Sequence, residues 1–120
     1  MGILSDIFES VVNFFKGIIT TYKRRSNMKK YIFNRDEFTW AEEFYELIKK
    51  KMGLPDYFGC NADALWDMLT GYIDTPCEIV LVGFGKEENV YNRNFLQRII
   101  SCFEDAAKEY PEQFKLTKIA

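Results

Sequence analysis

The sequence predicts a small α/β domain, in which a three-stranded parallel sheet is packed by helices, with an extra N-terminal amphipathic helix. Three runs, at 29–33, 78–84 and 114–119, have the length and the apolar or alternating pattern of strands. Segments of helical periodicity lie between them, and helices between strands favour a parallel sheet with right-handed crossovers. The run 78–84 is continuously apolar, which is typical of a strand covered on both faces.

The first 27 residues differ from the rest of the chain. Within 3–22, all the apolar residues fall on one half of a helical wheel and the polar residues fill the other half. The linker KRRSN follows at 23–27. Residues 1–27 carry a net charge of +2, whereas residues 28–120 carry a net charge of −4. We therefore expect an amphipathic helix with a basic linker at 1–27 and a separate folded domain at 28–120.

The first helix of that domain has a recognisable N-terminal signal. Thr39 and Glu42 have the spacing of a capping box, in which each side chain bonds a backbone N–H of the first turn. The helix should end near Gly53. Its expected buried residues are Trp40, Phe44, Leu47 and Ile48.

A second helix follows the loop 53–60 and has Asn61 as its predicted cap. On a helical wheel its two faces are chemically distinct. One face is the expected core stripe, made of Ala62, Leu65, Leu69, Tyr72 and Ile73. The other carries Asp63, Trp66, Asp67, Thr70 and Asp74.

The last helix and strand complete the expected order. A long helix at 92–109 ends before Pro111, and the strand 114–119 follows it. The residues expected on the buried face of this helix are Phe95, Leu96, Ile99, Ile100, Phe103 and Ala107.

The acidic face of the second helix indicates a protein partner with a basic, concave surface. No Lys or Arg lies between residues 60 and 77, so this helix does not neutralise its own carboxylates. Trp66 stands among them, and tryptophan is enriched at binding hot spots. The alternative is that Trp66 packs back over a neighbouring loop while the aspartates form an ordinary solvated face.

The composition argues against several other functions. Histidine is absent, which removes the commonest general base and metal ligand. The three cysteines form no CxxC and fit no common zinc spacing, so they predict buried, reduced thiols in an intracellular protein. Asp63 and Asp67 lie on adjacent turns of one helix, which seldom supplies the unequal environments of a catalytic carboxylate pair. The net charge of −2 does not point to nucleic acid. We expect no enzymatic activity, no metal, no other cofactor and no direct nucleic-acid binding.

The block LPDYFGCNADALWDMLTGYIDTP at 54–76 resembles the barstar family of intracellular ribonuclease inhibitors. The likeness lies in Leu-Pro-acid-aromatic-aromatic-Gly, an Asn two residues later, then DALWD and LTG followed by an aromatic residue. A weaker likeness in the order of the elements extends over 29–119. The resemblance implies a barstar-like fold and a cytoplasmic inhibitor, of immunity-protein or antitoxin type, for a cognate ribonuclease.

The resemblance also implies a binding surface. Asp67 would take the place of the substrate phosphate in the basic active site, Asp63 would meet a second basic residue, and Tyr57 would stack against the enzyme. Trp66 would support this surface by packing. The partner-binding residues implied are Tyr57, Asp63, Trp66, Asp67, Gly71, Tyr72 and Asp105.

Three residues depart from the family pattern. Tyr72 stands where the family has Trp, Asp105 where it has Glu, and Cys60 where it often has an acidic residue. Each departure bears on which ribonuclease is bound rather than on the mode of binding.

Residues 3–22 leave several interpretations open. The basic residues that follow them fit anionic lipid, which would hold the protein at the membrane surface. The alternating four–three spacing of apolar positions favours self-association or docking instead. The remaining alternative is that the segment is an extension packed on the domain, or that the start site is wrongly assigned and the protein naturally begins at Met28. The alternative function is a membrane-tethered or self-associating adaptor that uses the barstar-like surface on a different basic protein.

Overall fold

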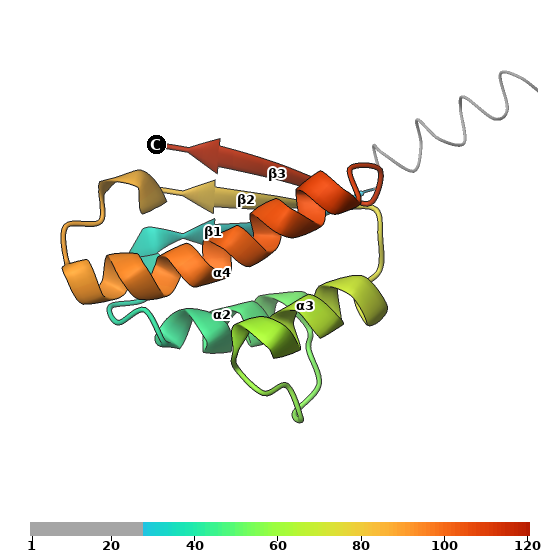
Figure 1. Cartoon of the computed structure of the whole chain (residues 1–120), viewed down its shortest axis with the longest axis horizontal. Coiled ribbons are helices and arrows are strands. Elements are labelled where there is room, and N and C mark those ends of the chain that lie inside the picture. Colours follow the sequence, from blue (N-terminus) through green and yellow to red (C-terminus); the bar gives the residue numbers. More distant parts are fainter. Residues whose placement is uncertain (1–27) are drawn as a thin grey trace, which may run out of the picture.

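The computed structural model of the chain describes residues 28–120 (Figure 1). The predicted amphipathic helix and its linker lie outside the described residues. The elements, in chain order, are β1 (Lys29–Asn34), the 3₁₀ helix η1 (Arg35–Glu37), α2 (Glu43–Met52), α3 (Ala62–Gly71), β2 (Cys77–Val82), the 3₁₀ helix η2 (Phe84–Lys86), α4 (Val90–Glu109) and β3 (Phe114–Ile119). The predicted order of strands and helices is confirmed.

The three strands form one parallel sheet in the order β1-β2-β3, so the α/β class and the parallel sheet are confirmed. The strand β2 ends at Val82, two residues before the predicted end. The reason is Gly83, whose φ of 79° is left-handed and turns the chain into η2. The helices α2, α3 and α4 lie on one side of the sheet (Figure 1).

The core lies between the sheet and these helices. Phe33 of β1 is completely buried, and its ring centroid is 5.4 Å from that of Phe44 in α2 and 6.1 Å from that of Phe103 in α4. The helix α3 contributes Leu65 and Leu69 to the same core. The core therefore fixes α3, which carries most of the implied binding residues, relative to the sheet.

The predicted capping box at Thr39 is wrong. The backbone N–H of Trp40 donates instead to Oε1 of Glu43 at 2.7 Å, and α2 begins at Glu43. The carbonyl of Thr39 accepts hydrogen bonds from Arg35 at 3.1 Å and from Asn92 of α4 at 3.3 Å, which holds this segment outside the helix. Trp40 precedes the helix, so it leaves the buried face and is 51% exposed, contrary to the expectation.

The predicted extension of α3 to Asp74 is also wrong. The backbone N–H groups of Tyr72 and Ile73 both donate to the carbonyl of Met68, which ends the helix at Gly71. Tyr72 is 48% exposed and not part of the core stripe. The carboxylate of Asp74 lies 3.5 Å from Nζ of Lys29 at the start of β1, away from the acidic face of α3.

Within residues 28–120, no helix is both long enough and apolar enough to cross a lipid bilayer.

Candidate partner-binding surface

The loop between α2 and α3 holds Tyr57 outward between two buried anchors. Leu54 and Phe58 are buried in the core, and the backbone N–H of Phe58 donates to the carbonyl of Pro55 at 3.0 Å. Tyr57 stands immediately before Phe58 and is 74% exposed, the most exposed of the large apolar side chains described. In Figure 1 this loop projects away from the sheet. The fold thus presents an aromatic ring on a loop that is fixed at both ends.

Asn61 joins this loop to α3. Its Oδ1 accepts a hydrogen bond from the backbone N–H of Ala64 at 2.8 Å, which is the predicted helix cap. Its Nδ2 donates to the carbonyl of Gly59 at 3.2 Å, which the sequence did not predict. A Cβ atom at Gly59 would lie only 3.2 Å from that Nδ2, so glycine lets the loop approach the cap closely. One amide side chain therefore sets the position of the loop relative to the helix.

Replacing Asn61 with alanine is expected to lower the free energy of unfolding by about 1 kcal/mol, because the first turn of α3 loses its cap. For a domain of this size, a loss of that magnitude lowers Tm by roughly 4–8 °C. Thermal unfolding followed by circular dichroism measures this change. Asn61→Asp is the matched control, since it keeps the acceptor and loses only the bond to Gly59. An unchanged Tm for Asn61→Ala would contradict the role assigned to Asn61.

The acidic face of α3 is exposed as predicted. Asp63 and Asp67 are exposed on successive turns, while Leu65 and Leu69 on the opposite side are buried. Among residues 28–120, no salt bridge involves Asp63 or Asp67. These two carboxylates are therefore exposed to solvent with no cation of the described domain bound to them.

The packing of α4 on α3 brings Asp105 to the same region. Burial above all, and after it the nearby negative charges of Asp105 and Asp63, raise the pKa of the Cys102 thiol in α4 to about 12. Both carboxylates therefore lie near Cys102, whose Sγ contacts the carbonyl of Ala62 at 3.7 Å. Asp105 is exposed, and no salt bridge in the described part of the chain includes it. Two helices thus contribute exposed carboxylates near the contact between α3 and α4.

Trp66 is half-buried and lies against the end of α4. Its ring centroid is 6.4 Å from that of Tyr110, and its backbone carbonyl accepts a hydrogen bond from Oγ1 of Thr70 at 2.8 Å. The indole therefore packs against the end of α4 and is not free in water, although its neighbours on α3 are carboxylates. Sequence reasoning missed Tyr110 as its partner, although the position of Tyr110 before Pro111 already marks the end of a helix.

The C-terminal end of α3 is open. Nothing lies within 4 Å of the place where a Cβ atom of Gly71 would be, and the neighbouring Tyr72 is half exposed. Cys60, at the other end, has a φ of 52°, and its Sγ lies 3.5 Å from Oε1 of Glu46. The departures at 60 and 72 therefore fall at the two ends of α3, on either side of the aspartates.

The described residues contain no group of three or more His, Cys, Asp or Glu side chains arranged to hold a metal ion. Cys77 and Cys102 are buried, and Cys60 is partly buried. Burial raises the pKa of Cys77 to about 11. Within the described residues, this surface offers a partner carboxylates and exposed aromatic rings, one of them on the fixed loop.

These features define a class of protein: a small parallel α/β domain that presents an acidic helix and an adjoining aromatic loop to a partner. The chain matches the family described as Barstar (barnase inhibitor) over residues 28–119. It is also 34% identical over 89 residues to a protein of Bacillus subtilis (strain 168) named "Putative ribonuclease inhibitor YrdF", an alignment that covers 74% of this chain and 97% of that protein. The chain belongs to the barstar family, and the resemblance in residues 54–76 is confirmed.

Proposed function

We propose that this chain inhibits a ribonuclease by inserting the acidic face of α3 and the adjoining loop into the basic site that binds RNA. The observation that carries the proposal is the group of exposed carboxylates at Asp63, Asp67 and Asp105, which form no salt bridge within residues 28–120. Membership of a family described as barnase inhibitors supports the same function. Inhibition by a bound protein requires no catalytic group, which agrees with the expectation that the chain is not an enzyme.

The chemistry follows from charge and shape. A ribonuclease binds the phosphates of RNA with basic side chains in a concave site, so carboxylates placed there compete with the substrate for the same donors. Asp67 takes the place of a phosphate, and Asp63 and Asp105 meet further basic groups beside it. Tyr57 and Tyr72 cover the apolar parts of the site. Trp66 acts as packing support, because its ring lies against Tyr110.

The fixed loop reduces the cost of binding. Leu54 and Phe58 anchor the loop in the core, and Asn61 holds it to α3, so Tyr57 is already positioned before the partner arrives. Ordering a loop on binding would otherwise reduce the affinity. The same domain is proposed to act inside the cell as an immunity protein or antitoxin against that ribonuclease.

Association with the ribonuclease is expected to slow as salt is added. Attraction between an acidic and a basic surface, of which the barnase–barstar pair is an established example, accelerates encounter by roughly 10- to 1,000-fold at low salt. Stopped-flow association rates should therefore fall at least about tenfold between about 0.01 M and about 0.5 M ionic strength. The double variant Asp63→Asn/Asp67→Asn should flatten this dependence, whereas Glu88→Gln on the connection before α4 should not. An association rate indifferent to salt would count against the proposal.

The direct test is an RNA-cleavage assay with barnase, the enzyme that gives the family its description, and with a panel of secreted bacterial ribonucleases. The full chain should inhibit at least one of them at a one-to-one ratio. Asp67→Lys should abolish that inhibition and leave the circular dichroism spectrum unchanged. Cleavage by every enzyme of the panel at undiminished rate would overturn the proposal for this class of ribonuclease.

A further inference from the structure

The sheet has a second face, which we call the outer face, on the side away from α2, α3 and α4. Side chains alternate between the faces of a strand, and the alternation together with the parallel register identifies the outer residues. Phe33, Ile79 and Leu81 belong to the core, whereas Val80 is buried but lies outside the core cluster. The outer face consists of Lys30, Ile32 and Asn34 from β1, Glu78, Val80 and Val82 from β2, and Lys115, Thr117 and Ile119 from β3.

The outer face is polar at one end and apolar at the other. At the polar end, Glu78 lies 3.8 Å from Nζ of Lys30 and accepts a hydrogen bond from Oγ1 of Thr117 at 2.6 Å. Toward the carboxyl ends of the strands, Ile32 and Ile119 are 48% and 50% exposed and flank the valines of β2. The helices α2, α3 and α4 all lie on the opposite face (Figure 1). Two large aliphatic side chains thus remain in water on an otherwise well-packed sheet.

Parallel sheets are almost always covered on both faces, because their strands are apolar on both. The strand β2 has this character: its alternating residues Ile79 and Val80 point to opposite faces, and both are buried. The described domain supplies helices for one face only. Within residues 28–120, the outer face therefore has no helical layer over it.

Residues 3–22 have the chemistry and the length to be that layer. They carry the apolar stripe of the chain, and as a helix of 20 residues they would be about 30 Å long. Strands of six residues are about 20 Å long, so one such helix spans the outer face. The linker 23–27 has five residues, which is an ordinary length for a connection between a helix and a strand that pack together.

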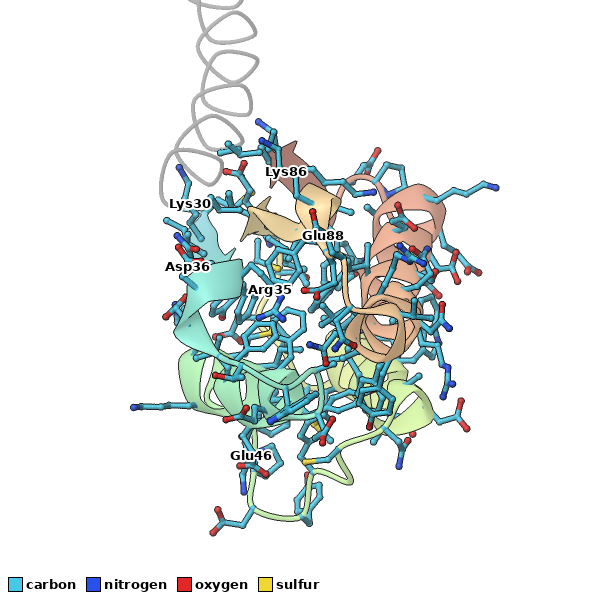
Figure 2. All side chains as sticks on the ribbon, turned by 90° about the vertical axis from the view of Figure 1, so that its left-hand side faces the viewer. Lys30, Arg35, Asp36, Glu46, Lys86 and Glu88 are labelled. Carbon is cyan, nitrogen blue, oxygen red and sulfur yellow. The ribbon has the colours of Figure 1, made fainter. Side chains whose placement is uncertain are left out.

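The attachment point favours the outer face over the exposed apolar group formed by Trp40, Val90 and Tyr91. The linker joins β1 directly, and β1 itself carries Ile32. Trp40, Val90 and Tyr91 form a second exposed apolar group, but Trp40 follows the carboxyl end of β1, at the opposite end of the strand from Met28. Five extended residues reach at most about 18 Å. Lys86, labelled in Figure 2, follows β2 and adds a basic group at the carboxyl edge of the sheet.

We infer that residues 3–22 form a helix that docks its apolar stripe on the outer face of the same molecule and completes a three-layer α/β/α domain. Docking covers Ile32, Val82 and Ile119 and leaves the acidic surface of α3 free on the far side of the core. The polar end of the outer face then lies under the C-terminal end of the helix, near the linker.

Paramagnetic broadening of methyl signals tests this arrangement in the full chain. A nitroxide is attached at Asn13→Cys, on the polar side of the stripe, in a Cys60→Ser background. Cys77 and Cys102 are buried, so the label does not reach them. The methyl groups of Ile32, Val82 and Ile119 should lose most of their intensity, whereas those of Leu65 and Leu69 in α3 should keep theirs. Phe15→Asp, in the stripe, should restore the lost signals, and the matched variant Ser10→Asp, on the polar side, should not.

One further sample makes each outcome decisive. In a mixture of spin-labelled unenriched chain with enriched unlabelled chain, docking within one molecule gives no broadening. Broadening in that mixture means that the helix covers a second copy, which overturns the inference. Absence of broadening in both samples also overturns it, and co-sedimentation of the chain with phosphatidylserine vesicles would then identify a membrane surface as the occupant of the stripe.

Discussion

Asp67→Ala is expected to weaken binding to the target ribonuclease more than truncation of any other residue on the acidic surface. Asp67 is exposed at the middle of α3, with Asp63 one turn before it and Tyr72 beyond it, so it lies at the centre of the proposed contact. Removing the carboxylate leaves basic groups of the enzyme buried without a partner. Losses of about 2–5 kcal/mol are usual for such pairs, which corresponds to roughly 30- to 4,000-fold in Kd.

Competition in the RNA-cleavage assay measures this loss. Asp36→Ala, an exposed carboxylate of η1 outside the proposed surface, is the matched control and should leave Kd unchanged. Asp105→Ala should give a smaller loss than Asp67→Ala, because Asp105 has a shorter side chain than the glutamate implied by the family and lies on the neighbouring helix. A Kd unaffected by Asp67→Ala would show that α3 does not enter the site.

Phe33→Ala is expected to produce the largest loss of stability. The Phe33 ring is completely buried and contacts rings of both α2 and α4, so its removal leaves a cavity where the sheet meets two helices. Truncating a buried phenylalanine costs about 3–5 kcal/mol, a large part of the 5–15 kcal/mol that usually separates folded from unfolded states. We expect Tm to fall by more than about 12 °C.

Thermal and urea unfolding measure this effect on the full chain. Tyr57→Ala removes an aromatic ring of similar size from an exposed position, and its stability should stay within about 0.5 kcal/mol of that of the original chain. The two variants therefore separate folding from binding: Phe33→Ala loses stability, while Tyr57→Ala loses affinity and keeps stability. A decrease in Tm of less than about 4 °C for Phe33→Ala would contradict the central place given to this residue.

Local sequence patterns predicted the structure correctly wherever one signal dominated a segment. The cap at Asn61, the end of α2 at Gly53 and the last strand at 114–119 are each fixed by residues close in sequence, and all three agree with the structure. The exposure of Asp63 and Asp67 follows from the burial of Leu65 and Leu69, because helical periodicity places the two pairs on opposite sides.

The expectations failed where distant groups compete with a local signal. Arg35 and Asn92 donate hydrogen bonds to the carbonyl of Thr39. The residues around Thr39 in the sequence do not reveal that these donors compete with the helix for this carbonyl. Similarly, Asp74 has helical spacing from Asp67, but it lies beyond the end of α3 and beside Lys29 of β1. Residues at helical spacing share one face only as far as the helix continues. Where a helix ends depends partly on contacts from outside it.

The sequence by itself determined the strand and helix order, the family and the acidic character of α3, because period, composition and the block at 54–76 are properties of neighbouring residues. The tertiary structure alone decided that Cys102 of α4 lies against the carbonyl of Ala62 in α3, and that Tyr110 packs against the indole of Trp66. These are contacts between helices about 40 residues apart in the chain, and the packing of both helices on one sheet brings them together.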